Sequence, residues 1–190
     1  MTARKSTVRI IAGEHRGRKL HFTDQNGDLR PTGDRMRETL FNWLQFELAG
    51  KRVLDLFAGS GALAAEALSR GAAHALLVEK KAERAADLSR QLKPLFEQRI
   101  FIRQADALKW LARSDGCFDL VFIDPPYHLG LQQAACDLLA AQGLLAAGAR
   151  IYVEAQRQDA ELYLPGWQLE KEKIMGDAHG RLYRVADSLS

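Results

Sequence analysis

The chain has 190 residues, of which 47% are hydrophobic and 27% are charged, and its formal net charge is +3. These values are typical of a soluble globular protein, and the length favours one domain with a sizeable core. No apolar run reaches about 18 residues and the start has no signal-peptide core, which argues against a membrane or secreted protein and favours the cytoplasm. Cys117 and Cys136 form no C-x-x-C pair and no cluster with histidines, so we expect free, packed thiols and no metal site.

Positive charge is concentrated in the first part of the chain. Residues 1–52 contain 11 Lys and Arg against 6 Asp and Glu, whereas residues 53–190 contain 16 against 18. Such a basic segment is either a solubilising extension or a surface that faces nucleic acid. We expect residues 1–30 to form a basic extension and residues 31–190 to form the main domain.

Two elements are predicted before the main sheet. Residues 8–22 alternate roughly between apolar and polar and contain Gly13 and Gly17, which predicts a β-hairpin with basic residues at its tip and on its exposed face. Residues 34–48 carry apolar side chains at helical spacing, which predicts a helix, and Gly50 ends this run.

From residue 53 onward, strand and helix patterns alternate, which predicts parallel βαβ units and a sheet covered on both faces. The expected strands cover 53–58, 75–80, 99–106, 118–124 and 149–155. The expected helices are one that ends near Gly71, one over about 81–92 that stops at Pro94, a short one from Ala107 and one over about 130–141. Residues 167–175 and 181–187 are joined too briefly for a parallel crossover, so we expect an antiparallel hairpin.

The loop "GSGALA" (59–64) follows the first of these strands and matches G-x-G-x-x-G/A, the pattern of a dinucleotide-binding turn. Gly59 and Gly61 let the backbone approach a ligand closely. Glu79, at the end of the next strand, lies where an acid commonly accepts hydrogen bonds from ribose hydroxyls. These features suit NAD and S-adenosylmethionine (SAM) equally.

The acids around this loop separate the two cofactors. Asp55 stands four residues before Gly59, and a carboxylate there would repel a pyrophosphate in a weakly screened site. SAM has no phosphate and carries an ammonium and a sulfonium, both of which nearby acids favour. Asp106, at the end of the third strand, suits the adenine amino group. We therefore predict a SAM site ringed by Asp55, Glu79 and Asp106; the alternative is that these acids only cap helices.

The stretch "FDLVFIDPPY" (118–127) is the most specific pattern in the sequence, since an apolar strand ends in Asp124-Pro125-Pro126-Tyr127. The exocyclic amine of a base is a poor nucleophile because its lone pair is delocalised into the ring. To attack a methyl group, the nitrogen must become pyramidal, with its two N–H groups held by acceptors. Asp124 and the Pro125 carbonyl can supply these acceptors. The prolines restrict the backbone, and Tyr127 offers a face on which an extruded base can stack. We predict that these four residues are catalytic; the alternative is a proline-rich turn with a packed tyrosine.

The order of these motifs resembles class I SAM-dependent methyltransferases that modify amino groups of bases. "VRIIAGEHRGRKL" (8–20), "RPTGDRMRETLFNWL" (30–44) and "LDLFAGSGALAAEALSRGA" (54–72) resemble, more narrowly, the bacterial 16S rRNA guanine-N2 methyltransferases of the RsmD family, over nearly the whole chain. The resemblance implies a Rossmann-like α/β fold with a seven-stranded, mostly parallel sheet, an antiparallel C-terminal hairpin and a small N-terminal appendage. It also implies SAM as methyl donor, S-adenosylhomocysteine as product and a guanine of 16S rRNA as target.

The same resemblance assigns roles to individual residues. Thr32 of the R-P-T motif, with Arg35 and Arg37, is expected beside the methionine end of SAM or the entering nucleotide; the alternative is a plain helix start with Thr32 or Asp34 as N-cap. Beside the acids, Phe57, Lys80 and Ala107 are expected in the cofactor site. Contacts with phosphates, which position RNA without specifying a base, are expected from Arg9, Arg16, Arg18 and Lys19.

Three further functions remain open, and so does the form of the substrate. An adenine-N6 methyltransferase acting on DNA or RNA would share every catalytic residue, although a DNA enzyme usually carries a target-recognition insertion for which this chain has no room. A non-catalytic RNA-binding assembly protein could keep the fold without needing Asp124, and an NAD-dependent dehydrogenase is a weaker alternative. For the methyltransferase we expect a monomer that acts on 16S rRNA within a partly or fully assembled 30S subunit.

Overall fold

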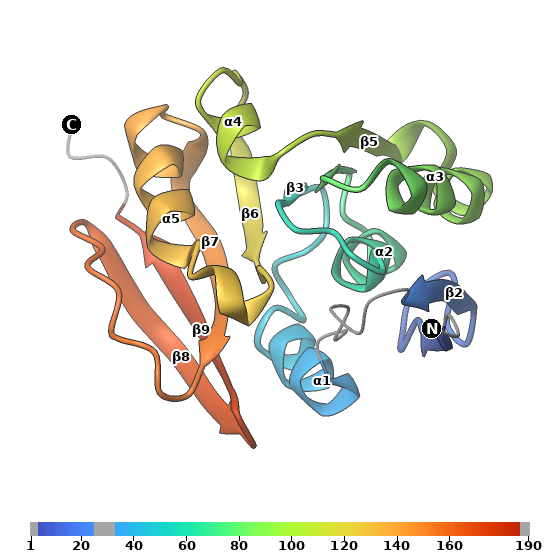
Figure 1. The fold of residues 1–190 in the computed structure, drawn as a ribbon, viewed down its shortest axis with the longest axis horizontal. Coiled ribbons are helices and arrows are strands. Elements are labelled where there is room, and N and C mark those ends of the chain that lie inside the picture. The colour runs from blue at the N-terminus through green and yellow to red at the C-terminus, as the bar shows by residue number, and fades with distance from the viewer. Residues whose placement is uncertain (1–3, 25–32, 187–190) are drawn as a thin grey trace.

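The centre of the protein is a seven-stranded sheet with the strand order β5-β4-β3-β6-β7-β9-β8 (Figure 1). The computed structural model describes residues 4–24 and 33–186. The parallel strands are β3 (Arg52–Asp55), β4 (His74–Glu79), β5 (Ile100–Gln104), β6 (Phe118–Ile123) and β7 (Leu145–Gln156). The hairpin of β8 (Trp167–Met175) and β9 (Ala178–Val185) adds to β7 in antiparallel fashion. The predicted Rossmann-like sheet with an antiparallel tail is confirmed.

Helices cover both faces of this sheet. They are α1 (Asp34–Trp43), α2 (Ala62–Ser69), α3 (Ala82–Phe96), α4 (Ala107–Leu111) and α5 (Gln132–Ala141), with short 3-10 turns η1 (Glu97–Arg99) and η2 (Tyr127–Leu129). The first three helices share one hydrophobic cluster with the sheet, and α4 and α5 share the other. The doubly covered sheet explains why its central strands are almost entirely apolar.

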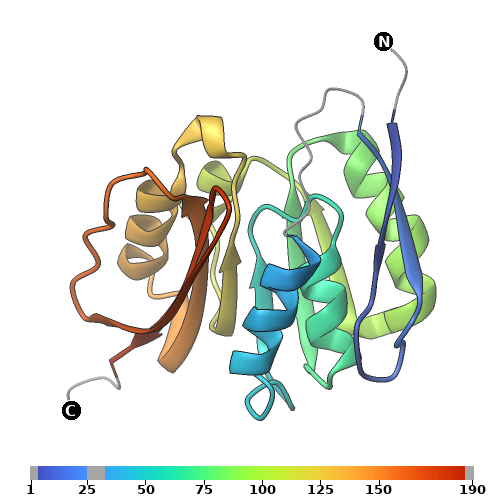
Figure 2. The same ribbon diagram turned by 90° about the horizontal axis from the view of Figure 1, so that it is seen from below.

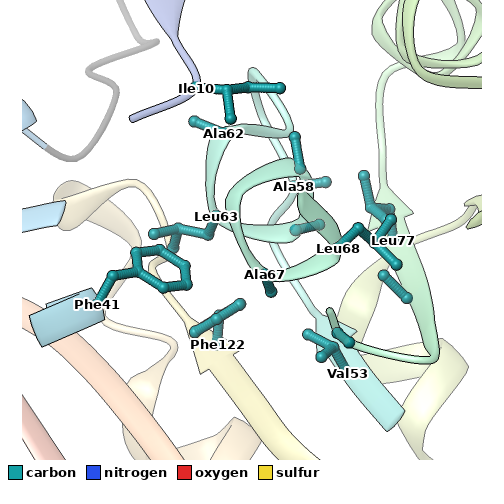
Figure 3. Packing of buried hydrophobic residues seen from close by; sticks show 14 of the residues in the cluster. Ile10, Phe41, Val53, Ala58, Ala62, Leu63, Ala67, Leu68, Leu77 and Phe122 are labelled. Atoms are coloured by element: carbon teal, nitrogen blue, oxygen red, sulfur yellow. The ribbon is translucent and has the colours of Figure 1, made fainter. Parts of the chain in front are cut away.

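Side chains alternate between the two clusters along each central strand. Val53 belongs to the cluster of α1, α2 and α3, and the next residue, Leu54, belongs to the cluster of α4 and α5. Figure 3 shows Val53, Leu77 and Phe122 gathered against α2. Because the period along a strand is two, this alternation also decides which face each polar residue at the strand ends meets.

The N-terminal hairpin consists of β1 (Arg4–Arg9) and β2 (Lys19–Asp24), which pair with each other in a separate two-stranded antiparallel sheet. Figure 2 shows it lying along α3. Its apolar face joins the cluster of α2 and α3 through Val8, Ile10, Leu20 and Phe22. The predicted hairpin is therefore confirmed, and the division of the chain at residue 30 stays a prediction.

Two predicted helix boundaries are wrong. Helix α1 ends at Trp43. The remaining apolar residues of that run, Leu44 and Leu48, follow the helix in turns and loops, and both side chains are buried. Helix α3 continues through Pro94 to Phe96. Pro94 lies in the last turn, so its missing N–H costs one hydrogen bond near the end of the helix, and burial of Phe96 stabilises that turn.

The structure also bears on the two cysteines and on membrane-spanning helices. Cys136 is buried on α5, Cys117 is partly buried, and both are free, as predicted. Across residues 4–24 and 33–186, no helix has the length and apolar character needed to cross a membrane.

Candidate active site

The glycine loop lies between β3 and α2, at the carboxyl end of the parallel strands. Gly61 is the N-cap of α2 and adopts a φ of 73°, in the left-handed region that favours glycine. A Cβ atom at this position would also come within 2.8 Å of Leu88 and Leu92 on α3. Gly61 is thus required by the turn and by the close approach of α3, and Gly59, with a φ of 51°, turns the chain just before it.

Glu79 ties this loop to the start of α3. One carboxylate oxygen accepts the N–H of Gly59 at 3.1 Å, and the other accepts the N–H of Lys81 at 2.8 Å. The residue is buried, with 7% of its surface exposed. A carboxylate has about four lone-pair sites, so each oxygen can accept one further hydrogen bond from a ligand.

Asp55 lies beneath the loop and is only 2% exposed. It follows Val53 by two residues, so it points to the face that α2 covers. Burial raises the pKa of its carboxyl to about 7, N–H groups of Ala64 and Phe57 partly offset this, and the charge of Glu79 adds to it. The aspartate holds the loop by its backbone and places a buried acid directly behind it.

The third predicted acid, Asp106, has two partners. Its carboxylate caps α4 by accepting the N–H of Lys109 at 3.3 Å, and it forms an ion pair with Lys80 at 3.1 Å. The hydrogen bond from Lys80 is the largest cause of the lowered pKa of Asp106. Ala107 is buried beside it, and Phe57 is partly buried against the cluster of α4 and α5. Asp106 thus caps α4, and its second oxygen pairs with the exposed side chain of Lys80.

The D-P-P-Y motif directly follows β6, on the strand next to β3. Phe122 belongs to the cluster of α1 and α2, so the alternation along β6 directs Asp124 to that same face. Pro125 is buried, whereas Asp124, Pro126 and Tyr127 are partly exposed. The motif therefore presents a carboxylate and an aromatic ring at the edge of the sheet where the glycine loop also lies.

Sequence reasoning missed the acid to which the motif is bonded. The Tyr127 hydroxyl donates to one carboxylate oxygen of Glu154 at 2.8 Å, and the Tyr152 hydroxyl donates to the other at 2.8 Å. Glu154 is 3% exposed, and burial raises the pKa of its carboxyl while the two tyrosine hydroxyls lower it. The only signal in the sequence is a single acid within the apolar run "IYVEA" (151–155).

The predicted RNA-binding residues separate into two groups. Exposed side chains belong to Arg9, Arg16, Arg18, Lys19 and Arg35. Arg37 is 1% exposed and donates to the carbonyl oxygen of Arg9 at 2.7 Å and to Asp34 at 2.9 Å. Arg37 is thus inside the protein, where it joins the hairpin to α1, and the expectation that it contacts RNA is corrected. Thr32 lies outside the described residues.

The basic hairpin is docked firmly onto the domain. Glu66 on α2 is fully buried, accepts the N–H groups of Ile11 and Ala12 at 2.7 and 3.0 Å, and pairs with Arg70 at 2.7 Å. Gly13 approaches α2 so closely that a Cβ atom there would lie 1.8 Å from the Ser69 carbonyl oxygen. The exposed arginines of the hairpin therefore have a set position relative to the loop and the D-P-P-Y motif.

Comparison with known proteins decides the family. The pattern of the family described as Conserved hypothetical protein 95 matches residues 8–184. The ribosomal RNA small subunit methyltransferase D of Escherichia coli (strain K12) is 43% identical over 178 residues, which cover 93% of this chain and 89% of that protein. The chain belongs to the RsmD family. The family resemblance predicted from the motifs is thereby confirmed.

Solved structures show the RsmD-family fold as well. The Escherichia coli protein yhhF, assigned as a methyltransferase, is 38% identical and similar with a TM-score of 0.87, covering 96% of this chain and 100% of that one. An RNA methyltransferase from Salinibacter ruber, solved in complex with S-adenosyl-L-homocysteine, has a TM-score of 0.63 at 12% identity, covering 85% and 97% of the two chains. This more distant likeness concerns the fold alone.

Proposed function

We propose that this RsmD-family protein transfers a methyl group from SAM to the exocyclic N2 of a guanine in 16S rRNA. The observation that carries the proposal is the D-P-P-Y motif at the end of β6, beside the glycine loop at the end of β3. Membership of the RsmD family supports it, because the Escherichia coli relative is named as a small subunit rRNA methyltransferase.

The residues around the glycine loop fit a bound SAM molecule. Glu79 is held by two backbone N–H groups and keeps acceptor sites for ribose hydroxyls. Asp106 follows β5 and pairs with Lys80, which follows β4; adenine is expected beside this pair, with Phe57 and Ala107 close to the same edge of the sheet. The buried carboxyl of Asp55, whose pKa burial raises to about 7, ionises more readily beside a cationic ligand than beside a pyrophosphate, which favours SAM at this loop. SAM, when bound, supplies an activated methyl group on a sulfonium.

The D-P-P-Y motif aligns the amine that accepts this methyl group. We infer that the Asp124 carboxylate and the Pro125 carbonyl oxygen accept the two N–H groups of guanine N2, which directs the nitrogen lone pair out of the ring plane. N2 then forms its bond to the methyl carbon as the carbon–sulfur bond breaks, and the proton that N2 loses passes to Asp124 or to water. Alignment and charge stabilisation supply most of the rate enhancement.

RNA is positioned by the docked hairpin. Arg9, Arg16, Arg18 and Lys19 contact phosphates, and Tyr127 stacks on the extruded base. Phosphate contacts do not specify a base, so we infer that the shape of a partly or fully assembled 30S subunit selects the nucleotide. The protein acts as a monomer in this scheme.

Methyl transfer from labelled SAM tests the proposal. The substrates are 16S rRNA and 30S particles from cells that lack the modification, and the products are analysed as nucleosides. We expect N2-methylguanosine, formed faster on the protein-bound RNA. N6-methyladenosine would assign the protein to the adenine-N6 enzymes, and tight binding of NADH without binding of SAM would overturn the cofactor.

A further inference from the structure

Tyr127 is the residue of the D-P-P-Y motif whose side-chain hydroxyl is bonded to a buried residue of the protein interior. Its hydroxyl donates to the Glu154 carboxylate at 2.8 Å, although Glu154 lies 27 residues later in the chain. Tyr127 is partly exposed, whereas Glu154 is 3% exposed. One end of the tyrosine is therefore anchored in the interior while its ring stays accessible.

The sheet register brings Glu154 beside the motif. Phe122 pairs with Tyr152 and Ile123 with Val153, so the parallel register of β6 and β7 continues from Asp124 toward Glu154. Tyr152 belongs to the same hydrophobic cluster as Phe122, and Glu154 follows Tyr152 by two residues, which places it on the same face of the sheet. Burial, Glu154 and then the charge of Asp124 raise the pKa of Tyr152 well above its ordinary value, as expected for groups on the same face of the sheet.

The carboxylate of Glu154 is held from both sides. Its second oxygen accepts the Tyr152 hydroxyl at 2.8 Å, and its backbone carbonyl oxygen accepts the side-chain amide of Gln132 at 3.2 Å. A buried carboxylate is costly unless it is hydrogen-bonded, so this acid needs both tyrosine donors. Tyr152 is completely buried and has no surface to offer a substrate.

A glycine on the neighbouring strand makes room for this arrangement. Gly180 of β9 pairs with Glu154, and a Cβ atom at Gly180 would lie 2.6 Å from the Tyr152 hydroxyl and 2.9 Å from the Met36 sulfur on α1. Any larger residue would displace the Tyr152 hydroxyl, and with it one of the two donors to Glu154. Three strands and α1 therefore converge on the anchor of Tyr127.

We propose that Glu154, with Tyr152 as its second donor, is a positioning residue that fixes the Tyr127 ring in the orientation in which it stacks on the extruded base. This inference rests on the proposed function, in which a base must leave its helix to reach Asp124. A free tyrosine ring samples several rotamers, and a hydrogen bond at the far end of the ring selects one before the base arrives. The benefit falls on the extruded complex and not on SAM or phosphate contacts.

A double-mutant cycle in the methyl-transfer assay tests this role. Tyr127→Phe removes one oxygen atom and leaves the stacking face, so we expect kcat to fall by about tenfold, as for loss of one hydrogen bond to a charged group, with the Kd of SAM and of RNA unchanged. Glu154→Gln should lower kcat similarly in the wild type, yet have little further effect in the Tyr127→Phe background. Tyr183→Phe, on the opposite face of the sheet, is the matched control and should leave kcat unchanged. Equal effects of Glu154→Gln in both backgrounds, or full activity of Tyr127→Phe, would overturn the proposal.

A second measurement needs neither SAM nor RNA. Fluorine NMR of protein labelled with 3-fluorotyrosine gives one signal from each of the 4 tyrosines. Glu154→Gln should shift the signals of Tyr127 and Tyr152 and leave those of Tyr163 and Tyr183 in place; an unmoved Tyr127 signal would overturn the anchor. If the wild type transfers no methyl group to rRNA, the proposed function fails instead, and these spectra still decide whether Glu154 holds Tyr127.

Discussion

Asp55 should make the stability of the protein depend on pH in an unusual direction. Its carboxyl is buried under the glycine loop, and burial raises its pKa from the ordinary 3.8 to about 7. The folded protein therefore holds this proton more tightly than the unfolded chain does. The contribution of Asp55 to the free energy of unfolding is fully present below pH 4 and is lost as the pH rises toward and through about 7. The reason is that Asp55 loses its proton at a lower pH in the unfolded chain than in the folded protein.

The size of the effect follows from the two pKa values. Each pKa unit corresponds to about 1.4 kcal/mol, so the separation between 3.8 and about 7 is worth about 4 kcal/mol. Asp55→Asn keeps the shape of the side chain and cannot titrate. The difference in free energy of unfolding between variant and wild type should therefore move by about 4 kcal/mol, in favour of the variant, between pH 4 and pH 8.

Urea denaturation at several pH values measures this difference, and Asp119→Asn is the matched control. Burial alone would raise the pKa of Asp119, but hydrogen bonds from Arg52 and its charge outweigh burial and lower it. The contribution of Asp119 is present above its ordinary pKa and is lost only as the pH falls, so its difference curve should be flat from pH 5 to 8. Parallel stability curves for wild type and Asp55→Asn would refute the assignment of a buried, protonated carboxyl.

Three further predictions concern the reaction, the RNA and the hairpin. Asp124→Ala should lower kcat by about a hundredfold or more with little change in the Kd of SAM measured by calorimetry, since it acts on the nucleotide amine; equal losses in both would contradict its role. Changing Arg16 and Arg18 to Glu should weaken rRNA binding and flatten the dependence of log K on log salt, and an unchanged slope would reduce the exposed hairpin arginines to a solubility feature. Glu66→Ala should lower the free energy of unfolding by about 3–5 kcal/mol, because two backbone N–H groups and Arg70 lose a buried partner; a loss within about 0.5 kcal/mol would show that the hairpin is not held there.

The regular part of the fold was predictable because local patterns and the fold agree. The strand 118–123 is apolar on both faces apart from Asp119 and is followed by the polar residue Asp124. The brief link in the C-terminal hairpin allows only an antiparallel return. Pro94 shows where the local rule failed. A proline predicts a helix end, but burial of Phe96 keeps the helix going for two residues beyond Pro94.

The motif residues of the candidate site were predictable from the sequence, but the buried residues that hold the motifs and the hairpin in place were not. Gly61 and Asp124 stand in motifs with fixed spacing, so their place at the carboxyl ends of the strands could be inferred from the chain alone. Glu66 and Glu154 are single acids in apolar runs, and each has partners more than 25 residues away in sequence. Arg37 follows the R-P-T motif closely in sequence. Its burial, however, depends on the docked hairpin, because its guanidinium donates to the Arg9 carbonyl oxygen. Contacts of this kind exist only once the whole fold is formed.

The most direct test of the central claim is nucleoside mass spectrometry of 16S rRNA from a bacterial strain whose own RsmD-family gene is deleted. Supplying this protein should restore N2-methylguanosine, whereas supplying the Asp124→Ala variant at the same level should not. Restoration by both proteins, a gain of N6-methyladenosine in place of N2-methylguanosine, or no methylation with the wild type would contradict the account.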